Sequence, residues 1–183
     1  MLRRPYPPHL LLVIAALVGV ASGGAGRTLE VNIQQDPNAF YDLGMANIVI
    51  GNYESAVGNF DAVIRIHRLD DRSYHMRCWA RAVIGRELRR ALADCNEVLR
   101  LNPNNFHVFD ARGFTNLKLG EFRRSIADYD TVLKFDPMRA ASLYGRGVAK
   151  RNIGDSVGAD ADIGAAKTIE PEIAERFARY GVK

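Results

Sequence analysis

Residues 109–137 read FDARGFTNLKLGEFRRSIADYDTVLKFDP, and this stretch decides the fold. Two segments with a helical pattern are separated by Gly120 and followed by Pro137. Glycine accepts the positive φ at which a helix can end in a short turn. Proline disfavours helix at the residue before it. The stretch therefore predicts a hairpin of two helices, over residues 106–119 and 122–135.

This hairpin recurs at a fixed pitch along the chain of 183 residues. Three in-phase series mark it: Gly44, Cys78, Gly113, Gly147 and Gly181; Gly51, Gly85, Gly120 and Gly154; and Ala56, Ala91, Ser125 and Ala159. Members of the first series lie 34, 35, 34 and 34 residues apart. Such a period indicates a helical repeat array. Stacked repeats form an extended concave surface, which is suited to binding another macromolecule.

The repeated motif in the third unit is Phe109-x2-Arg112-Gly113, then Ser125-x3-Tyr129, then Pro137. It resembles the tetratricopeptide repeat (TPR) family. The pattern of that family is an aromatic residue, then Leu-Gly, then Tyr, then Ala-x3-Phe and finally Pro. The resemblance covers residues 37–183. It implies an all-α fold, a right-handed α-solenoid of about four TPR hairpins plus a C-terminal capping helix. The units are expected at 37–70, 71–105, 106–139 and 140–173, with the cap at 174–183.

Arginine replaces the leucine of the family pattern in three units, at Arg77, Arg112 and Arg146. The aliphatic stem of arginine covers apolar surface while its guanidinium reaches an acid. The expected partners lie on the second helices: Asp94, Asp128 and Asp160. We expect these pairs to be structural rather than part of a binding site.

The first 21 residues have the features of a secretory signal peptide. Arg3 and Arg4 precede an apolar run over residues 10–21, which is too short to span a bilayer, and small residues follow it. Cleavage is expected after Ala21 or after Ala25. Residues 22–36 then form a short lead. This predicts a periplasmic or secreted protein of exported bacterial type, without a stable membrane anchor after cleavage. An uncleaved anchor is the alternative.

Charge and cysteine content narrow the function. The formal net charge is +4, and removing Arg3 and Arg4 leaves 23 basic against 21 acidic residues, or +2. So small a positive excess gives no electrostatic reason to expect nucleic-acid binding.

The two cysteines, Cys78 and Cys95, would meet an oxidising compartment after export. They form either a single disulfide or two buried thiols, and without further ligands they make no zinc site.

In the TPR family the first helix of each unit lines the concave groove, and this implies a groove that is unusually apolar and aromatic here. Exposed apolar surface of that kind generally marks a partner site. The expected partner-binding residues are Tyr41, Met45, Ile48, Arg72, His75, Trp79, His107, Phe114, Tyr144 and Arg151. Tyr41, Met45 and Met76 stand where chaperone-binding members carry the polar residues that clamp a peptide carboxylate, so that clamp is not implied.

The sequence predicts a non-enzymatic protein–protein interaction module of the cell envelope, a scaffold or adaptor that docks a helix or an extended peptide. No catalytic residues, cofactor or metal site are expected, because no catalytic triad spacing or phosphate-binding loop is present. The alternatives are a structural or homo-oligomeric unit whose groove is filled by its own chain, and a helical-repeat RNA-binding protein. Export, the small charge and the apolar groove oppose RNA binding.

Overall fold

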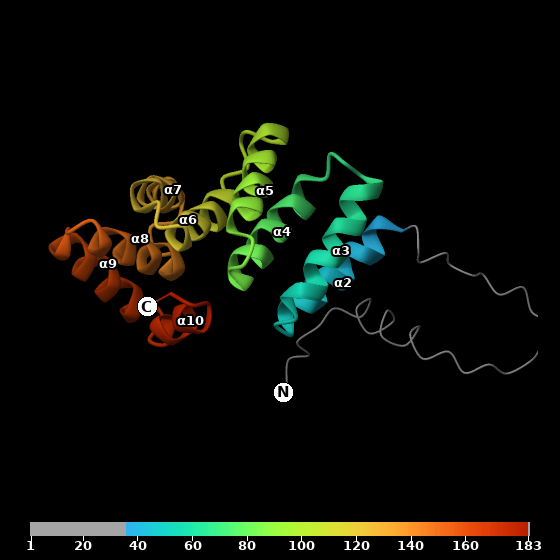
Figure 1. Cartoon of the computed structure of the whole chain (residues 1–183). Helices are drawn as coiled ribbons and strands as arrows, with labels where there is room; N and C mark the ends of the chain where they lie inside the picture. Colours follow the sequence, from blue (N-terminus) through green and yellow to red (C-terminus); the bar gives the residue numbers. More distant parts are fainter. Residues whose placement is uncertain (1–35, 183) are drawn as a thin grey trace, which may run out of the picture.

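A computed structural model describes residues 36–182, in which all regular secondary structure is helical. The expected signal peptide, and all of the lead except Asp36, lie outside the described residues. The helices follow one another as hairpins along the chain (Figure 1). They are α2 (Pro37–Val49), α3 (Tyr53–Ile66), α4 (Asp71–Ile84), α5 (Leu88–Leu101), α6 (Val108–Lys118), α7 (Phe122–Phe135), α8 (Ala140–Asn152), α9 (Ser156–Ile169) and α10 (Ile173–Arg179).

Glycine makes the turn inside each hairpin. Gly51, Gly85, Gly120 and Gly154 have φ values of 77°, 81°, 77° and 89°, in the left-handed region that favours glycine. Short polar side chains start several helices: Asp36, Asn52, Asp70 and Asp155 each accept a hydrogen bond from a backbone N–H of the first turn. The chain therefore reverses direction at regular intervals, which stacks the hairpins.

Within each hairpin the two helices cross where one side chain is very small. A Cβ on Gly44 would lie 2.7 Å from the ring of Phe60, and one on Gly147 would lie 2.7 Å from Ile163. Gly113 meets Tyr129 in the same way. The large residue of each pair comes from the second helix, so the glycine allows the ring or branched chain to lie flat between the helices.

The second unit replaces this glycine–large pair by a covalent bond. Cys78 on α4 and Cys95 on α5 form a disulfide with a Cα–Cα distance of 5.5 Å. Both residues are fully buried, and the Cys78 sulfur lies 3.7 Å from the Thr115 hydroxyl on α6. The cross-link closes a loop of 17 residues and joins the two helices at the position where the other hairpins cross.

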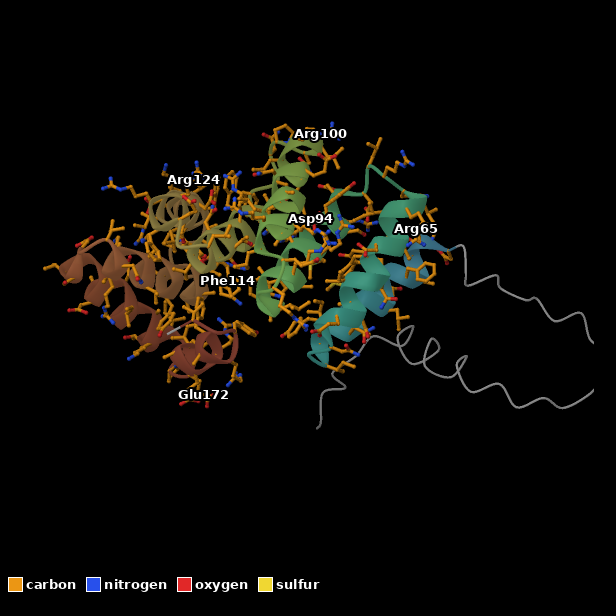
Figure 2. The ribbon with its side chains drawn as sticks, viewed as in Figure 1. Arg65, Asp94, Arg100, Phe114, Arg124 and Glu172 are labelled. Atoms are coloured by element: carbon orange, nitrogen blue, oxygen red, sulfur yellow. A yellow bond between two sulfur atoms is a disulfide. The ribbon has the colours of Figure 1, made fainter. Side chains whose placement is uncertain are left out.

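Arginines on the first helices join neighbouring units. The Arg77 guanidinium donates to both carboxylate oxygens of Asp94 on α5, at 2.9 and 2.6 Å, and also to Asp61 on α3 of the preceding unit. Asp94 lies between α4 and α5 (Figure 2). Arg112 makes the same pair of contacts with Asp128 and Asn96. The expected Asp94 and Asp128 partners are therefore correct.

The partner expected for Arg146 is wrong. Arg146 pairs with Asp162 at 2.7 and 2.6 Å and with Asp130 at 2.7 Å, whereas Asp160 pairs with Arg151. Two residues along a helix turn a side chain by about 200° around its axis, so Asp160 does not face Arg146 as Asp162 does and pairs instead with Arg151 near the end of α8. Asp162 also keeps the spacing of 34 that separates Asp94 from Asp128.

The last described helix, α10, is shorter than the first helices of the four units. Gly181, which has φ 79°, ends it instead of packing against a second helix. The outer face of α9 carries two exposed polar residues, Asp160 and Lys167. Earlier second helices have apolar residues at the equivalent positions: Val57, Leu92 and Ile126 in place of Asp160, and Ile64, Leu99 and Leu133 in place of Lys167.

The disulfide predicts a redox-dependent stability. A cross-link that closes a loop of this length stabilises a protein by about 3 kcal/mol in the chain-entropy model. We expect the double variant Cys78→Ala/Cys95→Ala to melt several degrees lower than the oxidised protein. Thermal melts with and without reductant measure this: reductant should lower the melting temperature of the wild type and leave that of the double variant unchanged. Alkylation of two thiols in the native, unreduced protein would contradict the bond.

A concave groove closed by the C-terminal helix

The first helices of the four units line one side of the molecule, and α10 lies across it. Between them is a cavity of about 520 Å³. Its walls come from α2, α4, α6 and α8, from the second helix α7, and from α10. The residues that line it are Tyr41, Arg72, His75, Met76, Trp79, Asn105, His107, Asp110, Ala111, Phe114, Tyr129, Arg139, Ala141, Arg176, Phe177 and Tyr180.

Aromatic rings from three helices form the floor of this cavity. The half-buried Trp79 lies 5.2 Å from Phe114, and Tyr180 stands edge-on to Trp79 at 5.7 Å. Phe177 on α10 packs on Phe114 at 5.7 Å. Phe114 is buried on the side of α6 that faces α10 (Figure 2). Such edge-to-face contacts add to the free energy gained by burying the rings.

Lys118 at the end of α6 holds the C-terminal segment over the groove. Its ammonium group donates to the Tyr180 carbonyl at 2.7 Å and to the Val83 carbonyl at 3.1 Å, and it lies 5.6 Å from the centre of the Phe114 ring. Burial lowers the pKa of Lys118, since removing water penalises the charged form. One side chain therefore joins units two and three to the last residues of the chain.

The polar groups of the cavity gather around Asp110. One oxygen of this carboxylate accepts a hydrogen bond from Arg139 at 2.8 Å, and the other accepts one from the Ser142 hydroxyl at 2.6 Å. Burial lowers the pKa of the neighbouring His75, and the nearby His107 lowers it further. Arg72 stands at the rim, bonded to Asp70 and 5.0 Å from the centre of the Tyr41 ring. The cavity is thus aromatic at its floor and rich in hydrogen-bond donors at its rim.

The structure gathers six of the ten expected groove residues around the cavity: Tyr41, Arg72, His75, Trp79, His107 and Phe114. The other four lie elsewhere. Met45 and Ile48 pack against the cluster around Phe60, and Tyr144 lies 4.8 Å from Phe177, beneath α10. Arg151 pairs with Asp160 at the far end of α8.

Several lining residues were not expected from the sequence. Arg139 and Arg176 do not fall on the positions that the family pattern assigns to the groove, and Tyr129 belongs to a second helix. Arg139 is the N-cap residue of α8, and Arg176 lies on α10, which ends beside Trp79 of α4. The repeat pattern carries no signal for the approach of α10 to α4.

No helix among residues 36–182 has the length and apolar character that crossing a bilayer requires. In the same part of the chain, no three His, Cys, Asp or Glu side chains come together as metal ligands would.

Comparison with models of known protein families gives no match, and comparison with curated proteins gives none. Solved structures do match. MamA from Desulfovibrio magneticus RS-1 is 19% identical with a TM-score of 0.63, over 79% of this chain and 87% of the other. YrrB, described as a TPR protein with an unusual peptide-binding site, is 19% identical with a TM-score of 0.62, over 79% and 75%. The first TPR of RPAP3, bound to the HSP90 peptide SRMEEVD, is 18% identical with a TM-score of 0.59, over 66% and 94%.

These similarities confirm the expected fold class, an all-α TPR solenoid with a terminal capping helix. At such low identity they show the fold alone.

The half-buried His75 predicts an acid-sensitive fold. Its pKa is lowered from the ordinary 6.5, so the unfolded chain binds a proton at a pH where the native state does not. Stability should therefore be complete above pH 6.5 and fall as the pH drops from there towards the native pKa. Urea denaturation between pH 7.5 and pH 5.5 measures this. His75→Gln should flatten the dependence and His67→Gln, an exposed control, should not; equal slopes in all three proteins would refute the assignment.

Proposed function

We propose that this protein is an exported interaction module that binds a peptide segment of another protein in its concave groove. One observation carries the proposal: a cavity of about 520 Å³, lined by the rings of Tyr41, Trp79 and Phe114, stays open beside α10. Grooves that combine aromatic rings with arginine are suited to anchoring a partner. YrrB and the RPAP3 domain, two proteins with the same fold, are described with a peptide-binding site and a bound peptide.

The binding is proposed to be non-enzymatic, with the protein acting as a scaffold or adaptor in the cell envelope. Support for the location comes from the sequence alone, from the signal-like residues 1–21. The disulfide is consistent with an oxidising compartment. N-terminal sequencing of the protein from the producing cells tests export, with a start at Ser22 or Gly26 expected. Intact Met1 in the membrane fraction would reject cleavage.

A charge-reversal experiment tests the groove. Arg72 and His107 are exposed at its rim, so Arg72→Glu/His107→Glu should leave the melting temperature within about 2 °C of the wild type while weakening partner binding about tenfold or more. The matched control is His67→Glu/Arg68→Glu, which makes the same substitutions at exposed positions away from the cavity. Each protein is immobilised and used to capture partners from an envelope extract, and the captured proteins are compared by quantitative mass spectrometry.

The position of α10 supports a second candidate function. Phe177 and Tyr180 already occupy part of the groove, as in a structural unit whose concave face is filled by its own chain. The capture experiment separates the two. Partners retained by the wild type and the control but lost from the groove variant support peptide binding. Equal capture by all three proteins, or recovery of a second copy of this chain alone, would reject it in favour of a structural or oligomeric role.

A further inference from the structure

The turns inside the hairpins of units one to three meet along one edge of the molecule, together with the end of α10. Arg86, just after the second turn, donates a hydrogen bond at 2.7 Å to Glu54, just after the first turn. Lys118, just before the third turn, donates to the carbonyls of Val83 and Tyr180. The surface that these segments share is called the turn edge, and it comprises residues 49–54, 84–90, 119–124 and 179–182.

Arginine is concentrated on the turn edge. Six exposed arginines belong to it: Arg86, Arg89, Arg90, Arg123, Arg124 and Arg179. Its acidic residues are Glu54, Glu87 and Glu121, so its net charge is +3. Of the 23 basic and 21 acidic residues that follow residue 21, this leaves 17 basic and 18 acidic residues for the rest of the chain. The positive excess of the protein therefore lies on this one surface.

Ion pairs within the turn edge do not neutralise it. The three glutamates pair with three of the arginines, as Arg86–Glu54, Arg90–Glu87 and Arg124–Glu121. Exposed pairs of this kind are weak and are screened by salt. The other three arginines, Arg89, Arg123 and Arg179, have no carboxylate within 4.0 Å among residues 36–182. Their guanidinium groups are free to bind an anionic partner.

Two arginine pairs lie where a helix disfavours positive charge. Glu-Leu-Arg-Arg (87–90) and Glu-Phe-Arg-Arg (121–124) place their arginines in the first turns of α5 and α7. The amino end of a helix carries a partial positive charge, so acids are preferred there and arginines cost stability. The equivalents of Arg89 in units one and four are Glu54 and Val157. The fold therefore does not require these arginines, which points to a role in binding.

The turn edge also exposes aliphatic side chains. An aliphatic residue precedes the glycine of each turn, and in unit one it is Ile50, which is 73% exposed beside the 61% exposed Val49. Ile84 and Leu119 at the equivalent positions are partly exposed. A partner held by charge alone gains nothing from these side chains. The interface of a bilayer accepts aliphatic groups beside arginines, whose guanidinium groups stay among the lipid headgroups.

We propose that the turn edge binds the surface of a bilayer that contains anionic phospholipids. The arginines bind the lipid phosphates, and Ile50 inserts between the headgroups. Attraction of this kind acts within a Debye length of the surface, so the binding is peripheral and depends on salt. Of the residues that line the groove cavity, Tyr180 alone belongs to the turn edge, so the inference does not depend on the proposed function.

Vesicle sedimentation with charge variants tests this. The protein from Ser22 to Lys183, which contains the whole described fold, is mixed with phosphatidylcholine vesicles that do or do not contain about 30% phosphatidylglycerol. We expect binding to the anionic vesicles at about 0.05 M salt and release at about 0.5 M. Arg89→Gln/Arg123→Gln should weaken the binding about tenfold or more, with a melting temperature equal to or above that of the wild type.

The matched control is Arg65→Gln/Arg68→Gln. It removes the same charge from two exposed arginines at the other end of α3, which also have no carboxylate within 4.0 Å in the described chain. The control should bind the anionic vesicles as the wild type does. Equal binding by the two double variants, or equal binding of the wild type to neutral and anionic vesicles, would overturn the proposal.

A second pair of variants separates a bilayer from an acidic protein. Ile50→Ser should weaken vesicle binding about threefold or more, whereas Leu69→Ser, at a residue of similar exposure on the opposite edge, should not. Equal binding by these two variants would reject insertion, and with it the reason for preferring a bilayer. A wild type that ignores anionic vesicles but binds polyglutamate through Arg89 and Arg123 would replace the bilayer by an acidic protein.

Discussion

The close approach of paired helices is the constraint on which this structure depends. Gly44 and Gly147 leave no room for a Cβ and Gly113 leaves very little, because Phe60, Ile163 and Tyr129 fill the space above them. Each crossing fixes how a hairpin is tilted, and the tilt repeated four times sets the curvature of the array. In the second unit a disulfide takes the place of this packing. The groove is a consequence of that curvature, since it brings α10 back towards α4.

The interfaces between hairpins use a different kind of contact from the crossings within them. Arg77, Arg112 and Arg146 each bind a carboxylate of their own unit in a bidentate geometry and an oxygen of the unit before. The planar guanidinium suits this geometry, because its donors point in two directions at once. Apolar packing sets the spacing of the helices, and the arginines align successive units in register.

Much of the fold follows from the sequence because the repeat is local. The positive φ of Gly51 and its equivalents, and the helix pairs on either side of them, depend on residues close in the chain. The partner predicted for Arg146 was wrong. Asp160 lies 32 residues after Asp128, whereas the observed partner, Asp162, lies 34 residues after it. Two residues along a helix turn a side chain by about 200° around the axis. In the candidate site, the rings of Trp79 and Phe114 follow from their repeat positions. Tyr129, Arg139 and Arg176 do not, because they reach the groove through its curvature and through α10, which no single unit encodes.

The contact between the end of the chain and units two and three changes the mechanics of the molecule. In a solenoid each repeat normally contacts only its neighbours, so the repeats can unfold one after another. Here Lys118 binds the carbonyl of Tyr180, 62 residues away, and Trp79 packs against the same residue. This clasp, formed by Lys118 and Trp79 with Tyr180, joins units two and three to the end of the chain, so the groove cannot widen between them until these contacts break. Such a molecule resists pulling as a single cooperative body until the clasp releases, and only then extends repeat by repeat.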